Sequence, residues 1–320
     1  MTRVTFGVIL PIGRRLELRD IPLPHTKWLA TTAAAQRAEE LGYDSVWVYD
    51  HLHNVPEPSH ETVFESWSVL AAISQHTQRI RLGHMVACNL FRPPPLVAKM
   101  AATLDVISGG RLEFGLGAGW DEGELRAFGY DFPSPRERLD RLTEAIQVIR
   151  TMWTEADATY DGTHYRLAGA QCDPKPRQQP NPPIWIGGAG EKRTLRIVAE
   201  HADCSNFGGT PDEWAHKCEV LATHCGDVGR DFDTILRSWE HDCFIRESPA
   251  DVDAVGSLDI WGADPATWRE ANLVGTPEQV CDRIQRYVDA GCGAFVIWPS
   301  DYPSHETLTL FAQRVIPEFR

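Results

Sequence analysis

An aspartate–histidine pair near the start of the chain has residue types suited to proton transfer. Asp50 and His51 follow the apolar run Asp44–Tyr49. Histidine titrates near neutral pH, and a neighbouring carboxylate can orient its ring. The pair therefore predicts an acid/base site in which His51 carries the proton and Asp50 orients it. The alternative is that Asp50 caps the following turn and His51 only packs.

A glycine-rich stretch, "GGAGEKRT", lies between an apolar run and a helical pattern. Glycines at such a junction leave backbone N–H groups at the positive end of a helix dipole, which favours a phosphate. Lys192 and Arg193 could add positive charge. The alternative is a tight turn with no ligand. The predicted phosphate-binding residues are Gly187, Gly188, Ala189 and Gly190.

A second glycine-rich stretch, "GLGAGW", ends another alternating run. Gly117, Ala118 and Gly119 would let the backbone approach a flat ring, and Trp120 could stack beside the ring or wall the substrate. The alternative is a core tryptophan, because the chain contains 11 tryptophans. Further candidate substrate contacts at the ends of apolar runs are Glu240, His241 and Trp298.

Short β-branched runs alternate with amphipathic stretches along the chain, which predicts parallel strands joined by helices. Eight such units indicate one closed (β/α)8 TIM barrel over residues 1–320, with its site at the C-terminal ends of the strands. Two stretches, 158–183 and 247–275, interrupt the rhythm and are predicted to be lid or insertion segments. The expected strands are Val4–Leu10, Asp44–Tyr49, Ile80–Ala87, Arg111–Gly117, Pro183–Gly188, Ala202–Phe207, Ile235–Phe244 and Ala294–Trp298.

The overall composition argues against several classes of partner. A formal net charge of −14 disfavours nucleic acid and anionic membranes. The 8 cysteines form no C-x-x-C pair and lie in apolar segments, so we expect reduced, buried thiols and no metal site. The first apolar run stops at Pro11, and no segment approaches the length of a membrane span. We therefore expect a cytoplasmic protein that binds small molecules.

Several segments together resemble the bacterial-luciferase-like superfamily of flavin and deazaflavin oxidoreductases. They include "LGYDSVWVYDHLH", "RIRLGHMVACNLFRPPP", "ISGGRLEFGLGAGWDEGELRAFGYDFPSPRERLDRL", "PPIWIGGAGEKRTLRIVAEHAD" and "VGTPEQVCDRIQRYVDAG". They occur in the family's order over most of the chain. Within the superfamily, the chain is most similar to the branch that depends on coenzyme F420.

This resemblance implies a TIM barrel that holds a deazaflavin ring at the strand ends. It places Asp50 near the ring, His51 as the acid/base, and a non-prolyl cis peptide at Met85–Val86, which with Ala87 backs the ring. It assigns Gly117–Gly119 to the ring and Gly187–Gly190 to the phosphate. It also implies a homodimer, with a separate reductase supplying reduced cofactor.

Two departures from the family pattern bear on the substrate. The sugar-phosphate dehydrogenases carry a catalytic glutamate where this chain has Trp120, and their active-site tryptophan is replaced near Val55, which argues against a sugar phosphate. The first hypothesis is hydride transfer between F420 and a small organic molecule. The second is a two-component monooxygenase that borrows reduced flavin mononucleotide (FMN). The third is a flavin-binding protein without turnover.

Overall fold

The computed structural model describes residues 3–253 and 264–320. In these residues, eight strands form a closed parallel barrel in which each strand pairs with the next and the last pairs with the first. All eight coincide with predicted runs, and the TIM barrel is confirmed. The barrel strands are β1 (Thr5–Ile9), β2 (Ser45–Val48), β3 (Arg81–His84), β5 (Leu112–Gly117), β8 (Ile184–Gly187), β9 (Cys204–Asn206), β10 (Leu236–Ile245) and β12 (Ala294–Pro299).

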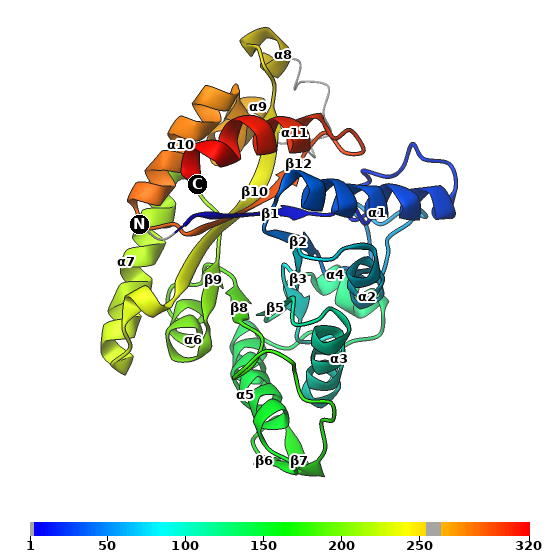
Figure 1. Cartoon of the computed structure of the whole chain (residues 1–320). Coiled ribbons are helices and arrows are strands. Elements are labelled where there is room, and N and C mark those ends of the chain that lie inside the picture. The colour runs from blue at the N-terminus through cyan, green and yellow to red at the C-terminus, as the bar shows by residue number, and fades with distance from the viewer. Residues whose placement is uncertain (1–2, 254–263) are drawn as a thin grey trace.

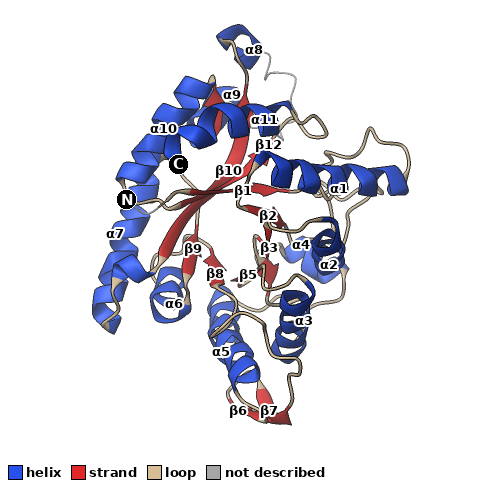
Figure 2. Cartoon of the chain, in the orientation of Figure 1, coloured by secondary structure: helices blue, strands red, loops and turns tan. Residues whose placement is uncertain are grey.

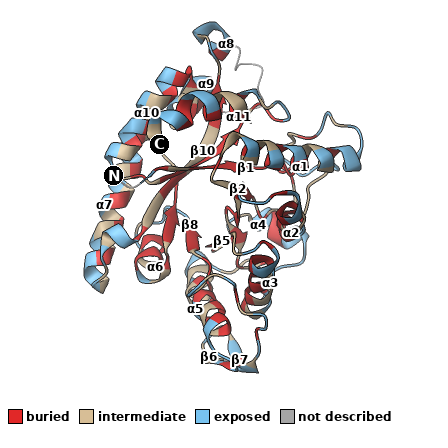
Figure 3. Ribbon diagram, in the orientation of Figure 1, coloured by how far each residue is buried: buried red, intermediate tan, exposed pale blue. Residues whose placement is uncertain are grey.

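Helices surround the strands, as Figures 1 and 2 show. Their inner faces are buried and their outer faces are exposed (Figure 3), as expected for amphipathic helices on a barrel. The main helices between strands are α1 (Pro24–Leu41), α2 (Ser66–His76), α3 (Pro94–Ile107), α5 (Pro135–Thr154), α6 (Thr194–His201), α7 (Pro211–Val228) and α10 (Pro277–Asp289). None of the described helices has the length and apolar character needed to cross a membrane.

Shorter elements decorate this frame. β4 (Ala87–Cys88) pairs with β5, and β11 (Leu273–Gly275) pairs with the far end of β10. The remaining short helical segments are α4 (Glu122–Ala127), α8 (Pro249–Asp253), α9 (Pro265–Ala271), α11 (Glu306–Leu310), Phe232–Thr234, Phe311–Val315 and Ile316–Phe319.

Large aromatic side chains fill the barrel where its strands carry glycine. The fully buried Trp47 ring on β2 lies between Gly7 of β1 and Gly83 of β3. A Cβ atom at Gly83 would lie 2.3 Å from this ring, and one at Gly7 would lie 2.5 Å from its Nε1. The ring also meets Trp185 edge-on, with 4.8 Å between centroids. Because these rings fill the interior of the barrel, the polar side chains that form a site lie at the C-terminal ends of the strands.

The first predicted lid or insertion segment lies beside α5. Residues 158–183 contain a hairpin, β6 (Ala158–Asp161) and β7 (Arg166–Ala170), which Figure 1 places at the outer end of α5. The Glu144 carboxylate on α5 accepts hydrogen bonds from the backbone N–H groups of Thr163, His164 and Tyr165. The hairpin packs along a helix, and a lid or insertion role for this segment stays a prediction.

The second predicted lid segment, 247–275, follows β10 and thus leaves the barrel at the face where a site is expected. Its described parts are α8, α9 and β11, and residues 254–263 lie outside the described residues. A lid function for it stays a prediction, as does the single-domain organisation.

Candidate active site

A cavity of about 510 Å³ opens at the C-terminal ends of the strands. This is within the range of roughly 300–1,000 Å³ that is usual for cofactor and substrate pockets. Most of the predicted site residues line it, namely Asp50, His51, Met85, Val86, Ala87, Gly117, Ala118, Gly119, Trp120, Gly187, Gly188, Glu240 and His241. Ala189, Gly190 and Trp298 are not among the lining residues.

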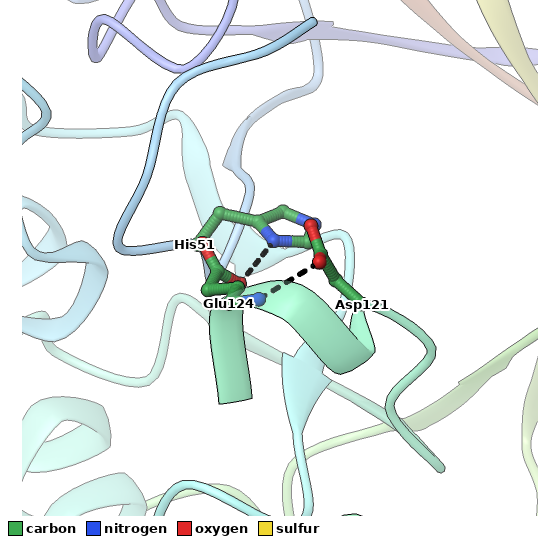
Figure 4. A group of neighbouring side chains, drawn as sticks. All are labelled: His51, Asp121 and Glu124. Atoms are coloured by element: carbon green, nitrogen blue, oxygen red, sulfur yellow. Dashed lines mark hydrogen bonds and ion pairs between the residues drawn. The ribbon is translucent and has the colours of Figure 1, made fainter. Parts of the chain in front are cut away.

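His51 is held by a glutamate from another strand end. Its Nδ1 lies 2.7 Å from Oε2 of Glu124 on α4 (Figure 4). The other carboxylate oxygen of Glu124 accepts hydrogen bonds from the backbone N–H groups of Leu52 and His53, both 2.7 Å long. Because a carboxylate only accepts, Nδ1 is the protonated nitrogen of His51, and Nε2 is the nitrogen that can exchange a proton.

The predicted role of Asp50 as the partner of His51 was wrong. The buried Asp50 carboxylate instead accepts hydrogen bonds from the Ser66 hydroxyl at 2.7 Å, the Cys88 backbone N–H at 2.9 Å and the Arg92 guanidinium at 2.8 Å. Adjacent residues at the end of a strand point in different directions, so neighbours in sequence need not meet. Asp50 therefore ties the end of β2 to α2, to β4 and to the loop before α3, and this fixes the backbone that carries His51.

One guanidinium, that of Arg14, lies beside both Glu124 and Asp121. Arg14 Nη2 lies 3.1 Å from Asp121, and its Nη1 lies 3.4 Å from Glu124. Burial tends to raise the pKa of Glu124, but hydrogen bonds from His51 and two backbone N–H groups outweigh burial and lower the pKa. Burial is likewise outweighed at Asp121, whose pKa is lowered by the Glu124 backbone N–H and by Arg14. Both groups are therefore carboxylates at neutral pH.

The wall formed by β4, β5 and β8 is made of backbone and one branched side chain. The expected cis peptide at Met85–Val86 is present. Val86 packs against Gly117 and Gly187: a Cβ at Gly117 would lie 2.6 Å from Val86 Cγ2, and one at Gly187 would lie 3.0 Å from it. These glycines therefore make room for Val86, while Gly119, at a φ of 80°, needs the left-handed backbone.

The predicted phosphate loop is only partly at the cavity. Gly188, at a φ of 128°, and Thr194, the first residue of α6, line it. Arg193, a candidate source of positive charge, pairs instead with Asp140 on α5 and donates to the backbone carbonyl of Arg136. The exposed Lys192 remains a candidate.

The opposite wall carries polar side chains that follow β1 and β2 or lie on β10. The Tyr49 hydroxyl donates a 2.7 Å hydrogen bond to Glu240, and Arg15 forms an ion pair with Asp242. The buried Trp298 ring lies behind this wall, 5.9 Å from the ring of Tyr49 and 4.9 Å from the guanidinium carbon of Arg15. Trp298 thus contacts two residues that line the cavity, Tyr49 and Arg15, without lining it itself.

Trp120 is not a core residue. It is 68% exposed at the cavity, and its ring lies edge-on to His51, with 5.6 Å between centroids. Since the ring is held beside His51 with one face uncovered, it is suited to contact a ligand that His51 also contacts.

Comparison with known proteins places this arrangement in a family. Residues 4–264 match the family model described as luciferase-like monooxygenase. The chain belongs to the luciferase-like monooxygenase family. It is an enzyme of this family, and the expected family membership is confirmed.

The sequence relatives include a protein named as an F420-dependent dehydrogenase and one named as a monooxygenase. The chain is 29% identical over 313 residues to "F420-dependent glucose-6-phosphate dehydrogenase" of Microbacterium testaceum, covering 88% of this chain and 91% of that protein. It is 32% identical over 219 residues to "Pyrimidine monooxygenase RutA" of Allorhizobium ampelinum, covering 66% of this chain and 58% of that protein.

Solved structures share the fold at lower identity. One is an F420-dependent secondary alcohol dehydrogenase in complex with an F420-acetone adduct, with a TM-score of 0.82, 21% identity and 99% coverage of both chains. Another is the monooxygenase RslO1 from Streptomyces bottropensis, with a TM-score of 0.81, 21% identity and coverage of 99% of this chain and 100% of that one.

The luciferase-like site contains functional candidates that sequence reasoning missed, namely Arg14, Arg15, Tyr49, Asp121 and Glu124. The only local signal for Glu124 is the pattern of Asp121 followed by Glu three residues later. Asp121 caps α4 by accepting from the Glu124 backbone N–H at 3.0 Å. That signal predicts a helix start and says nothing of His51.

His51, Asp121 and Glu124 also bring three potential metal-ligand atoms within 4.8 Å of one another. Arg14 already faces both carboxylates, and Glu124 already accepts two backbone hydrogen bonds. A cation would have to compete with these donors, so the cluster is better suited to hold a protonated imidazole nitrogen than a metal ion. The prediction that the site uses no metal stays a prediction.

Proposed function

We propose that this enzyme transfers a hydride between the deazaflavin coenzyme F420 and a small organic substrate, with His51 as the acid/base. The observation that carries the proposal is the 2.7 Å contact between His51 Nδ1 and Glu124 in the wall of the cavity. It leaves Nε2 to exchange a proton with a substrate that lies between the glycine-lined wall and the Tyr49–Glu240 wall.

The cofactor fits the wall formed by β4, β5 and β8. Val86 and the backbone of Gly117 and Ala118 offer a flat surface for the ring, while Gly188 and Thr194 at the start of α6 face a phosphate. When bound, the deazaflavin supplies hydride chemistry at its C5 atom, which the protein itself cannot provide. Two relatives named above are F420-dependent by name, which supports this assignment.

The protein's own contribution is to move a proton and to exclude water. In the oxidation of an alcohol, for which a bound deazaflavin would serve as the hydride acceptor, His51 Nε2 would take the proton from the substrate oxygen. In the reverse direction, the protonated His51 returns that proton. Glu124 holds the ring in the tautomer that this exchange needs, and Asp50 positions His51 through the backbone. Trp120, Glu240 and His241 are the proposed substrate contacts.

A second candidate is a monooxygenase that borrows reduced FMN from a separate reductase. The matched family model and the relatives RutA and RslO1, which are named monooxygenases, favour it. The chemistry would differ in its use of oxygen, whereas the same wall would hold the ring.

The deciding experiment titrates the purified protein with oxidised F420 and, separately, with FMN, following cofactor fluorescence. We expect micromolar binding of F420 and weaker binding of FMN. The opposite preference, together with oxygen consumption on addition of reduced FMN, would support the monooxygenase. Binding of either cofactor with no turnover of alcohols, enones or imines, in wild type and in His51→Ala alike, would favour a flavin-binding protein without catalysis.

We propose that the enzyme is a cytoplasmic homodimer that contacts its partner through the face formed by α2 and α3. A groove of about 680 Å³ runs between these helices and is lined largely by apolar side chains, including Trp67, Met100, Leu104 and Ile107. Leu96 on the same face is 50% exposed. Burying such a groove in a second copy removes apolar surface from water. A separate reductase would supply reduced cofactor when the substrate is reduced.

A further inference from the structure

The inner face of β10 carries two carboxylates, of which Glu240 lines the cavity and Asp242 contacts the lining residue Arg15. Asp242 is two residues further along β10 and lies on the same face of the strand. One oxygen of Asp242 forms the ion pair with Arg15. The other oxygen accepts a 2.8 Å hydrogen bond from Nε1 of Trp268, which belongs to α9. A single carboxylate thus joins the segment after β10 to a residue of the cavity wall.

Arg15 is held on several sides. Its guanidinium carbon lies 5.5 Å from the ring centre of Tyr49 and 4.9 Å from that of Trp298. Its backbone N–H also donates to Glu17 at 2.8 Å. An arginine held between two aromatic rings and a carboxylate keeps one position, because each contact restricts a different rotation of the side chain.

The charges at this end of the cavity do not cancel. Among the described residues, Asp242 forms an ion pair with Arg15, while Glu240 accepts a hydrogen bond from the neutral Tyr49 hydroxyl and lies near Arg15 as a second negative charge. At the other end of the cavity, Arg92 pairs with Asp50, and Arg14 faces both Asp121 and Glu124, which also holds the His51 ring. The end with Glu240 and Asp242 therefore carries an excess formal charge of one carboxylate.

We propose that Glu240, Asp242 and Arg15 form a charge filter that admits neutral or cationic substrates and rejects anionic ones. In this proposal, Trp268 is a positioning residue that holds Asp242 against Arg15. The inference rests on the proposed function, because that function defines the substrate. Which charge the site prefers follows from the charges of the cavity wall. It means that the glucose 6-phosphate in the name of one relative is not the substrate here, because a phosphate would meet an excess of carboxylate.

The test uses three probes of one shape and different charge: benzylammonium, benzyl alcohol and benzoate. Their dissociation constants for the F420-loaded enzyme are measured by ligand-observed NMR at low ionic strength. We expect benzylammonium to bind most tightly and benzoate most weakly, by about tenfold or more between the extremes, which is the effect of one close charge at partial burial. Equal binding of the three probes, or tighter binding of benzoate, would overturn the filter.

Two substitutions test whether Asp242 and Glu240 cause the preference for benzylammonium over benzoate. Asp242→Asn and Glu240→Gln each remove one negative charge, so each should reduce the preference for benzylammonium over benzoate by about tenfold. If neither substitution changes the preference, the probes bind at another site on the protein and the proposal fails. Because Asp242→Asn could disturb folding, Glu240→Gln, which loses charge without touching Trp268, provides the second route to the same conclusion.

Trp268→Phe tests the positioning role, since it keeps the ring and removes the Nε1 donor. We expect it to weaken the preference several-fold while the Kd for F420 stays unchanged. The matched control is Trp153→Phe, which removes a 3.0 Å hydrogen bond to the Ala98 carbonyl in the packing between α5 and α3. An equal effect of the two variants would overturn the role of Trp268.

A failure of the proposed function can be distinguished from a failure of the charge filter. If the protein does not bind F420, the hydride-transfer proposal fails, and the three probes still rank the charge preference of the cavity in the protein alone. Normal F420 binding with no charge preference would overturn only the filter. Glucose 6-phosphate added to the F420-loaded enzyme should give no cofactor reduction, and turnover with it would also overturn the filter.

Discussion

His51 and Glu124 are 73 residues apart in sequence, yet Nδ1 of one lies 2.7 Å from Oε2 of the other. The contact joins the strand end after β2 to the helix after β5, and the same carboxylate ties down the backbone of the two residues that follow His51. The orientation of the proposed acid/base therefore depends on a residue that belongs to another part of the barrel.

Substitution of Glu124 should slow proton transfer without removing the cofactor. Glu124→Gln keeps an oxygen for the backbone N–H groups and removes the charge that stabilises a protonated His51. We expect kcat to fall by about 10- to 100-fold, as for other partners of a functional histidine. The Kd for F420 should stay within about twofold, since Glu124 is not among the residues proposed to hold the ring. Steady-state kinetics and a cofactor titration measure both values.

A matched control for this prediction is Glu144→Gln. Glu144 also accepts several backbone hydrogen bonds, but at the β6–β7 hairpin, outside the residues that line the cavity. A similar loss of kcat in both variants would mean that Glu124 acts only on stability. The pH profile of kcat should move in Glu124→Gln alone.

His84 should make stability depend on pH. Burial lowers its pKa from 6.5 to about 4, and among the described residues neither ring nitrogen has a hydrogen-bond partner. Between these two values the unfolded chain binds a proton that the folded protein does not. The free energy of unfolding should therefore fall as the pH falls from 6.5 to about 4, by roughly 3 kcal/mol for this group alone. Urea unfolding at several pH values measures the slope.

His84→Phe should flatten that slope. The ring of phenylalanine can still pack against Trp67, whose centroid lies 4.3 Å from that of His84, and it has no proton to bind. An unchanged slope in this variant would show that other groups cause the pH dependence.

The turn before α6 should not tolerate a side chain at position 188 without a loss of F420 affinity. Gly188 has a φ of 128°, which other residues rarely adopt, and a Cβ there would lie 3.2 Å from Thr194 Cγ2. We expect Gly188→Ala to shift the turn and to weaken F420 binding by about tenfold or more, given a backbone strain of roughly 1–3 kcal/mol. Gly226→Ala, on α7 where a Cβ would meet nothing within 4 Å, should leave the Kd unchanged. Equal F420 affinity in both variants would remove Gly188 from the proposed phosphate site.

The α2–α3 face should control assembly. Leu96→Glu would place a charge in the proposed apolar contact, so we expect the dimer to dissociate at micromolar concentration in light scattering. Leu29→Glu is the control, because Leu29 on α1 is also 50% exposed but lies outside the groove. A wild-type monomer, or dissociation in neither variant, would contradict an interface on this face.

The barrel could be predicted because its signals are local. Alternating apolar residues and helix-ending glycines such as Gly42 mark each unit without reference to the rest of the chain. The strand ends could be located for the same reason, and with them His51, Trp120 and Glu240. Adjacency in sequence suggested Asp50 as the partner of His51, but the direction of the side chains at the end of β2 sends Asp50 toward Arg92.

Contacts between distant segments could not be predicted in this way. Nothing local to Glu124 distinguishes it from other acids in a helix start, and nothing local to Gly117 says that it faces Val86. The hairpin in residues 158–183 illustrates the same limit, because its position depends on Glu144 in the preceding helix. A long excursion in sequence indicates extra structure but does not say which face of the barrel the structure covers.

The ten residues of β10 extend past the barrel to pair with β11, and they carry Glu240 and Asp242 on the way. The proposed cofactor wall is encoded between Met85 and Thr194, whereas the opposite wall combines Arg15 and Tyr49 with β10, which the following segment supports. Insertions, deletions or recombination in that later stretch would thus change the β10 side of the opposite wall and leave the cofactor wall intact. Related enzymes could therefore acquire new substrates through mutations in this region of the gene while keeping the same cofactor.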